Sequence, residues 1–371
     1  MVKVDKLFFE LLQIALGNRE RLSVVPSVEE WTEMYAEPER QAVTGILLQG
    51  IERLPAEQRP SQEILLQWIG VGQMIEQQNR LLDERCKWLL DKLKNAGLDG
   101  TILKGQGIAQ LYDKELRSQR QSGDIDVYVN CGIRKALAFA KSQGLKDVEW
   151  DYKHLHLNLW DDIEVEMHYR VEVLLNLWKN RRLQKWFQKH QDAMFCNLNH
   201  NDNLNEIVTP TVEFNVFYIL LHIYRHFLYE GVGLRQIVDY YFVLKAIANT
   251  DSTDKTDYAL EAVSQFGMEK LAKGLMWMMH EALGMPREWM LWEPNEKEGK
   301  YILEEVMAGG NFGHHDERLQ HGGGKWNTVK QVCMHNWHLL SHYPSDVIWA
   351  PVWFLWHKVW KTWMLFKGLK V

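Results

Sequence analysis

The stretch Gln121–Val129, QSGDIDVYV, places Asp124 and Asp126 at the head of a run of strong β formers. Side chains at positions i and i+2 of a strand share a face, so both carboxylates and Tyr128 lie opposite the three aliphatic residues. Two like charges about 4 Å apart repel by roughly 4 kcal/mol at an effective dielectric constant of 20. A folded chain tolerates them if one is protonated, if both face water, or if a cation bridges them.

The composition is typical of a folded chain with a large core. The 371 residues are 46% hydrophobic and 25% charged, which suits two or three domains. The net charge of −6 gives no reason to expect a nucleic-acid backbone as the main partner. The four cysteines form no CxxC pair, which is typical of reduced thiols in a cytoplasm. The longest uncharged apolar run, 347–356, is too short to span a bilayer, and 7–16 is typical of an amphipathic helix rather than a signal peptide.

Hydrophobic periodicity changes twice along the chain and predicts three regions. Residues 1–97 are helical in pattern, with a helix start at PSVEEW and a heptad-like stretch from about Gln62 to Ala96. Residues 98–170 contain one helix, GIRKALAFAKSQG, and residues 171–371 are helical again. We therefore predict an α+β fold, in which a small mixed β-sheet core is flanked by extensive N- and C-terminal helical regions. The expected strands are GTILKG, DIDVYV, HLHLNLW and IEVEMHY.

The segment IEVEMHY offers a third carboxylate to the aspartate pair. Glu164, Glu166 and His168 alternate with apolar residues, so they share one face of the expected strand. Converging acids need a cation, and Mg²⁺ takes oxygen ligands that it commonly shares with substrate phosphates. Asp124, Asp126 and Glu166 therefore predict a site for Mg²⁺, with Mn²⁺ as the alternative, that is suited to phosphoryl transfer.

A second motif, ILKGQGIA, follows the first expected strand. Gly105 and Gly107 stand at the start of a short helix, where bare amides can hold phosphate oxygens, and Lys104 adds a positive charge. The Walker pattern GxxxxGK[ST] is absent, so the glycine pair alone is weak evidence of a phosphate site.

The order of motifs carries a family resemblance over roughly residues 25–290. Leu-Lys-Gly is followed by Arg120, four residues before the first aspartate, and then by Gly-Asp-Ile-Asp and the acid-x-His strand. His-x3-His and Gly-x-Gly-Leu-Arg-x3-Asp follow in HIYRHFLYEGVGLRQIVDYYFVL. Together these motifs resemble the uncharacterised bacterial nucleotidyltransferase family of the polymerase-β-like superfamily. The superfamily's usual Gly-Ser pair is replaced by Lys104-Gly105, which departs from its common way of gripping the triphosphate.

The resemblance implies metal-dependent transfer of a nucleoside monophosphate from an NTP to an acceptor, with release of pyrophosphate. Asp124 and Asp126 would hold the metal ions and Glu166 would be the third acid, so Mg²⁺ would bridge the paired charges. The acceptor is a small molecule or a protein, and neither its identity nor the oligomeric state follows from the residues. The expected nucleotide- and phosphate-binding residues are Lys104, Gly105, Arg120, Arg225, His226 and Arg235.

Polar residues of the C-terminal region allow two interpretations. His222, Arg225 and His226 lie within about one helical turn, and Arg235 and Asp239 follow on the next helix. They could contact phosphate, or they could make ordinary helix-packing contacts. His222 and His226 lack a nearby third soft ligand, which disfavours a zinc site. The late loop also offers ligands for metal or phosphate, although surface loops often have this composition: His314, His315, Asp316 and His321 precede glycines 322–324.

Five tryptophans near the C-terminus form a stripe at spacings of 4, 3, 4 and 3, which is one face of a helix. We expect this stripe to pack against the helical body rather than to contact a membrane surface or a second copy. The tryptophans are Trp349, Trp353, Trp356, Trp360 and Trp363, with Lys358, Lys361 and Lys367 nearby.

Two alternatives to the nucleotidyltransferase remain. Metal-dependent glycosyltransferases also use Asp-x-Asp to hold a sugar nucleotide, but the sequence lacks the long strand and helix alternation of that fold. A catalytically inactive nucleotide-binding protein of the same fold is the other alternative, and intact Asp124, Asp126 and Glu166 argue against it.

Overall fold

The computed structural model describes residues 3–195, 207–250, 256–311, 339–340 and 342–369. The chain forms two compact units, each assembled from three separate segments. The consecutive domains 1–97, 98–170 and 171–371 stay a prediction, because the units are defined by compactness alone. Unit 1 comprises residues 1–81, 109–122 and 216–321, and unit 2 comprises residues 82–108, 123–215 and 322–371.

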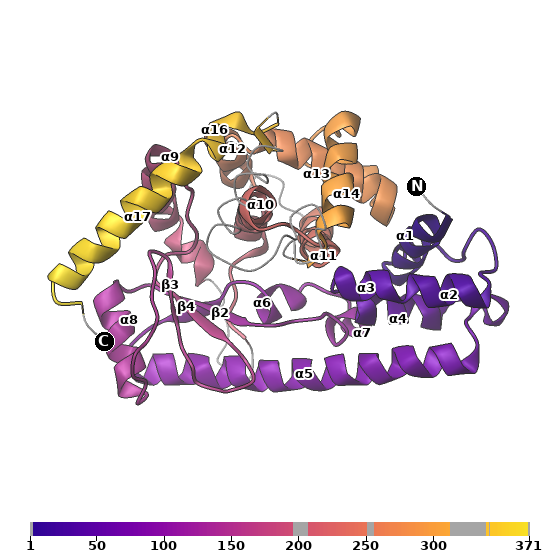
Figure 1. The fold of residues 1–371 in the computed structure, drawn as a ribbon, viewed down its shortest axis with the longest axis horizontal. Helices are drawn as coiled ribbons and strands as arrows, with labels where there is room; N and C mark the ends of the chain where they lie inside the picture. The colour runs from indigo at the N-terminus through magenta and orange to yellow at the C-terminus, as the bar shows by residue number, and fades with distance from the viewer. Residues whose placement is uncertain (1–2, 196–206, 251–255, 312–338, 341, 370–371) are drawn as a thin grey trace, which may run out of the picture. The chain divides into compact units, whose positions relative to one another are not determined.

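The predicted α+β class is confirmed by a mostly helical chain with one small mixed sheet. The sheet belongs to unit 2 and has the strand order β1-β2-β4-β3. β1 (Gly100–Ile102) pairs antiparallel with β2 (Ile125–Val129), and β2 pairs parallel with β4 (Val165–His168). β3 (His154–His156) pairs antiparallel with β4 (Figure 1). Each strand lies within one of the four short, β-branched or alternating segments that the sequence predicted.

The register of the strands gathers polar side chains on one face of the sheet. Asp126 lies opposite Glu166, and Tyr128 lies opposite His168. On the next strand His156 lies opposite Glu166. The residues of the other face are buried and apolar, which fixes the register because a slip of one residue would exchange the two faces. These residues are Ile125, Val127, Val129, Val165 and Met167.

Helix α5 packs closely against the first strand of this sheet. A Cβ at Gly100 would lie 2.7 Å from Leu93 Cδ1, so glycine lets helix α5 approach the strand closely. Asn176 caps a second helix, α9, by accepting hydrogen bonds from the backbone of Trp178 and Lys179. The described α-helices with residues in this unit are α5 (Gln62–Asn95, in part), α6 (Gln106–Ala109, in part), α8 (Ile133–Ser142), α9 (Leu177–Lys189), α10 (Val212–Tyr229, in part), α16 (Pro344–Val347) and α17 (Trp349–Phe366).

The tryptophan stripe on α17 packs against the segment that precedes β3. The Tyr152 ring contacts Trp353, Trp356 and Trp360 edge to face at centroid distances of 5.4, 4.9 and 5.0 Å. Trp363, at the end of the stripe, remains 51% exposed. The stripe therefore packs within the chain, as expected, but on the α/β core rather than on the helical body.

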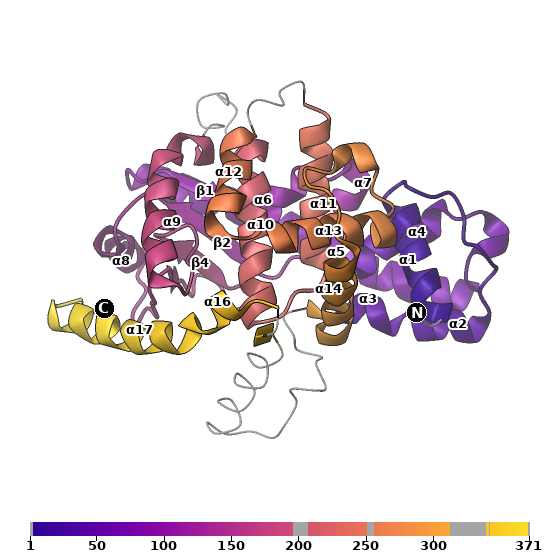
Figure 2. The same ribbon diagram turned by 90° about the horizontal axis from the view of Figure 1, so that it is seen from above.

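Unit 1 is helical, and glycines bring its helices together. A Cβ at Gly274 would lie 2.5 Å from Ile302 Cδ1, and a Cβ at Gly299 would lie 2.4 Å from Trp277 Cε3. Helices α13 and α14 therefore pack at short range (Figure 2). The described α-helices with residues in this unit are α1 (Lys3–Ala15), α2 (Val28–Met34), α3 (Ala36–Arg40), α4 (Thr44–Arg53), part of α5, the last residue of α6, α7 (Lys114–Arg117), most of α10 (Val212–Tyr229), α11 (Leu234–Ala248), α12 (Asp257–Phe266), α13 (Glu269–Leu283) and α14 (Glu296–Gly309).

Two helix boundaries match the sequence signals closely. Ser27 and Glu30 form a capping box at the start of α2, where PSVEEW predicted a helix start. The heptad-like stretch from about Gln62 to Ala96 is α5, which ends at Asn95. Within the described part of the chain, no helix combines the length and apolarity needed to cross a membrane.

Candidate functional site

Three carboxylates of unit 2 converge where β2 and β4 lie side by side. Asp124 directly precedes β2, Asp126 is the second residue of that strand, and Glu166 is its cross-strand neighbour on β4. One oxygen atom from each carboxylate lies within 4.8 Å of the other two. The structure thus brings together the three acids that the sequence selected, while their catalytic role stays a prediction.

Two cationic side chains reach the same carboxylates. Lys104 Nζ lies 2.9 Å from Asp126 Oδ1. His168 Nε2 lies 2.9 Å from the same oxygen and 3.2 Å from Glu166 Oε2. Asp126 is only 2% exposed and His168 is fully buried, so these contacts are shielded from water. Lys104 and His168 therefore offset the repulsion between the neighbouring carboxylates.

These contacts determine which of the side chains of Asp126, Glu166 and His168 are charged. Burial alone would raise the pKa of Asp126, but the Lys104 charge and the His168 hydrogen bond outweigh burial and hold that pKa well below its ordinary value. The pKa of Glu166 is likewise lowered, because contact with His168 outweighs burial. Burial would lower the pKa of His168, yet hydrogen bonds to Asp126 and Glu166 raise it. Both acids are therefore anionic, and His168 donates from Nε2 to each of them.

Two histidines of β3 extend the cluster and were not selected from the sequence. His154 Nδ1 lies 3.4 Å from Glu166 Oε2, and His154 Nε2 lies 3.1 Å from His156 Nε2. Burial and the nearby His168 charge lower the pKa of His154 to about 3, so its ring is neutral. The alternation in HLHLNLW placed both rings on one face, but only the pairing of β3 with β4 brings them to the acids.

The Lys104-Gly105 segment is held beside the start of β2. The backbone N–H of Leu103 donates to the carbonyl oxygen of Asp126 at 2.9 Å, which places Lys104 next to the acids. Gly105 has a φ of +52°, a left-handed conformation that favours glycine. A Cβ at Gly107 would lie 2.4 Å from the Ile102 carbonyl oxygen, so this position also requires glycine.

The donor set fits a hard divalent cation. Asp124, Asp126 and Glu166 supply only carboxylate oxygens, which are the ligands that Mg²⁺ prefers. Glu166 also belongs to a second possible metal-binding group with His154 and His168. Imidazole ligands suit zinc, copper, iron or nickel, whereas Mn²⁺, like Mg²⁺, suits carboxylate ligands. The arrangement can therefore hold a divalent ion next to a cationic lysine, which is a suitable setting for a phosphate group.

The other predicted phosphate ligands belong to unit 1, and Arg120 is the most enclosed of them. Its Nε and Nη2 donate to the two carboxylate oxygens of Asp239, each at 2.7 Å, and Nη1 donates to Ser122 Oγ at 2.6 Å. Tyr112 donates to the same Asp239 carboxylate at 2.6 Å. Arg120 is 4% exposed, so this buried pair ties α11 to the segment before β2.

The remaining arginines and histidine also have partners within unit 1. Arg225 Nη2 and His226 Nδ1 each lie 2.8 Å from a different carboxylate oxygen of Glu230. Arg235 Nη1 donates to the carbonyl oxygen of Gln121 at 3.2 Å. Contact of these side chains with a nucleotide stays a prediction.

Two further expectations concern histidines outside the acid cluster. The rings of His222 and His226 are 4.2 Å apart, but among the described residues this pair joins no group of three potential metal ligands. The late-loop ligands His314, His315, Asp316 and His321 and glycines 322–324 lie outside the described residues.

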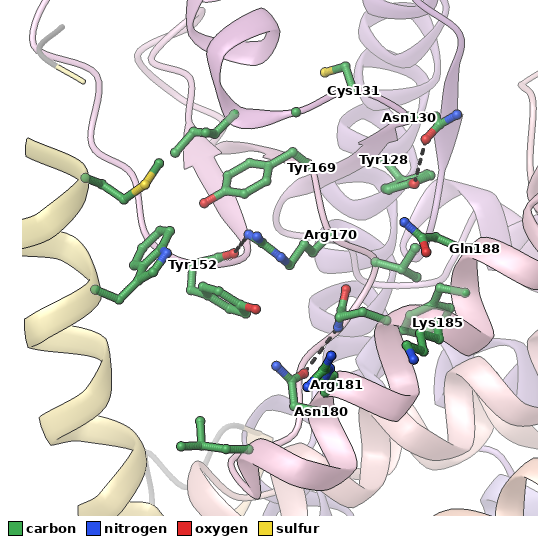
Figure 3. Close-up of a pocket in the computed structure, with 18 of the residues that line it drawn as sticks. Tyr128, Asn130, Cys131, Tyr152, Tyr169, Arg170, Asn180, Arg181, Lys185 and Gln188 are labelled. Atoms are coloured by element: carbon green, nitrogen blue, oxygen red, sulfur yellow. Dashed lines mark hydrogen bonds between the residues drawn. The ribbon is translucent and has the colours of Figure 1, made fainter. Parts of the chain in front are cut away.

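A cavity of about 1040 Å³ in unit 2 was also missed by the sequence analysis. It lies between α9, α17 and the ends of β2 and β4 (Figure 3). Basic and aromatic side chains that are far apart in the sequence line it together, among them Arg170, Arg181, Lys185, Tyr152 and Trp360. No local motif links these positions, so only folding reveals the cavity.

The comparisons with known proteins agree with the motifs. A family model described as an uncharacterised nucleotidyltransferase matches residues 27–284, which is well over half of the chain. The matched range includes the three acids, Lys104 and Gly105. Neither a search of curated proteins nor a search of solved structures gave a match. The chain therefore belongs to the family of uncharacterised nucleotidyltransferases.

Proposed function

We propose that the protein is a metal-dependent nucleotidyltransferase that transfers a nucleoside monophosphate from an NTP to an acceptor and releases pyrophosphate. The observation that carries this proposal is the convergence of Asp124, Asp126 and Glu166 within 4.8 Å, in a chain of a nucleotidyltransferase family. An all-carboxylate group of this size suits the binding of Mg²⁺ together with the phosphates of a nucleotide.

Each residue of the cluster has a distinct part in the proposal. Asp124, Asp126 and Glu166 hold Mg²⁺, or Mn²⁺ in its place, which when bound neutralises phosphate charge and stabilises the entering and leaving oxygens. His168 orients Asp126 and Glu166 through its two hydrogen bonds. Lys104 supplies a further positive charge beside the nucleotide's phosphates.

The two alternatives fit the observations less well. The described strands form one four-stranded sheet with short strands, whereas a glycosyltransferase of the Asp-x-Asp class needs a long series of alternating strands and helices. An inactive nucleotide-binding protein has no need for three converging acids, because their mutual repulsion disfavours an anionic nucleotide unless a metal ion is present.

Calorimetry with a non-hydrolysable NTP analogue tests the site. We expect binding to require Mg²⁺, and Asp124→Asn, Asp126→Asn or Glu166→Gln to weaken it at least about tenfold, because charge-assisted contacts contribute about 1.5–3 kcal/mol. Asp162→Asn is the matched control, since Asp162 is an exposed acid that pairs with Arg85. Binding that is independent of Mg²⁺, or equal in all variants, would contradict the proposal.

A further inference from the structure

The cavity of unit 2 has the chemistry of a site for a small anion. Its side chains carry the positive charges of Lys135, Arg170, Arg181 and Lys185, and among the described residues that line it none is acidic. Its volume of about 1040 Å³ is at the upper end of the range for small-molecule sites. The cavity therefore has both the charge and the room for an anion larger than inorganic phosphate.

Aromatic side chains give the same cavity surfaces for a ring. Tyr152, Trp356 and Trp360 line it from α17 and from the segment before β3, and their rings already pack edge to face. The Arg170 guanidinium lies 3.8 Å from the centre of the Tyr152 ring and donates to the Tyr152 carbonyl oxygen. Figure 3 shows Tyr152, Tyr169 and Arg170 on one side and Arg181 and Lys185 of α9 on the other. A planar ligand can thus meet π-faces and cations together.

The position of the cavity relates it to the three acids. Tyr128 lines the cavity and lies two residues along β2 from Asp126, on the same face, which is a separation of roughly 7 Å. Lys104 and Gly105 lie near the opposite end of β2, next to Asp124 and Asp126. Along β2 the order is therefore Asp124 and Asp126, beside the Lys104-Gly105 segment, and then Tyr128 at the cavity.

This order matches the geometry of in-line transfer, in which entering and leaving oxygens lie on opposite sides of the α-phosphorus. We propose that the cavity is the acceptor pocket, and that the acceptor is a small molecule with a sugar or aromatic ring and a phosphate or carboxylate group. This inference rests on the proposed nucleotidyltransferase function.

The proposed transfer needs no reactant other than the NTP and the acceptor. An acceptor hydroxyl oxygen bonds to the α-phosphorus while the bond from that phosphorus to the bridging oxygen breaks. The electron pair of the broken bond leaves with pyrophosphate, and the hydroxyl proton passes to water. The basic residues of the cavity hold the acceptor's own anionic group and take no part in bond making.

Calorimetry on the full chain, saturated with Mg²⁺ and a non-hydrolysable NTP analogue, tests the pocket. The probes are phenyl phosphate and its neutral counterpart phenol. The test variant combines Arg181→Gln with Lys185→Gln, both at exposed positions on α9 that line the cavity. The matched control combines Arg182→Gln with Lys189→Gln, which removes the same charge from exposed positions of α9 that do not line it.

We expect the parent to bind phenyl phosphate at least about tenfold more tightly than phenol. The test variant should lose at least about tenfold in that affinity, because it lacks two charged donors, while the control changes less than about twofold. Affinity for the NTP analogue should be equal in all three proteins. Unchanged probe binding in the test variant, or probe binding to the parent only when the analogue is absent, would overturn the inference.

The two proposals fail in different ways. If the parent does not bind the NTP analogue in a Mg²⁺-dependent manner, the proposed function is wrong and the acceptor role falls with it. If the analogue binds as expected but the probe shows no preference for the anion, only the acceptor pocket is wrong. Because the two affinities are measured separately, each result identifies the proposal that it contradicts.

Discussion

Asp126 connects the charge pattern of the sequence to the chemistry of the site. Its carboxylate is buried, contacts Lys104 and His168, and lies next to two other acids. The three acids concentrate negative charge where a metal cation can bind. Lys104 and His168 offset part of this charge, so the chain can fold without a bound metal. The same contacts make Asp126 important for stability as well as for the proposed metal binding.

Asp126→Asn is therefore expected to lower the free energy of unfolding by about 3 kcal/mol, because removal of one partner leaves buried charges of the other sign uncompensated. Urea unfolding at neutral pH measures this change. Asp162→Asn, which removes one partner of an exposed ion pair, should cost less than about 1 kcal/mol. A variant as stable as the parent would show that the Lys104 and His168 contacts contribute little.

Substitution of Arg120 distinguishes a structural role of this residue from the phosphate-binding role that the family resemblance implies. Lysine cannot reproduce the two-pronged contact with Asp239, so Arg120→Lys should lower the free energy of unfolding by about 2–3 kcal/mol in urea. Arg80→Lys at the exposed pair with Glu76 should cost less than about 0.5 kcal/mol. If Arg120→Lys keeps its stability and loses NTP binding, Arg120 is a nucleotide ligand instead.

At the scale of elements, α13 and α14 show how glycine sets the packing distance of two helices. Gly274 has no room for a methyl group, whereas a Cβ at Gly70 of α5 would meet no atom within 4 Å. The same substitution at these two helical positions should therefore have opposite effects.

Gly274→Ala is expected to destabilise the protein by about 1–3 kcal/mol through overpacking against Ile302 and Glu298. Gly70→Ala should stabilise it by about 0.5–1 kcal/mol, since alanine is the better helix former and the site is open. Thermal or urea unfolding measures both changes. Equal effects of the two substitutions would contradict the close approach of α13 and α14.

The elements that the sequence predicted well are those whose cause is local. Short β-branched or alternating segments located all four strands, and the capping box at Ser27 and the glycine after α5 marked helix boundaries to within a residue or so. The convergence of Asp126 and Glu166 could be predicted because each acid lies on the polar face of its strand. The contacts of His154 and Lys104 could not be predicted in this way. They depend on strand order, which alternation within single segments does not contain.

At the scale of the whole molecule, spatial neighbours come from distant parts of the chain. The cavity of unit 2 combines residues from about 128 to 188 with residues of α17, so composition and periodicity gave no sign of it. The two compact units are also interleaved along the sequence. Motifs could identify the family, because a motif keeps its order along the chain, but tertiary pairing decides which side chains meet.

The central claim is that the three acids serve transfer of a nucleoside monophosphate, and the position of a radioactive label tests it most directly. The parent is incubated in cell extract with Mg²⁺ and an NTP labelled at either the α- or the γ-phosphate. We predict that α-label alone becomes attached to an acceptor, that γ-label appears in pyrophosphate, and that Asp124→Asn and Asp126→Asn abolish both. Attachment of γ-label, or full transfer by both variants, would contradict the account.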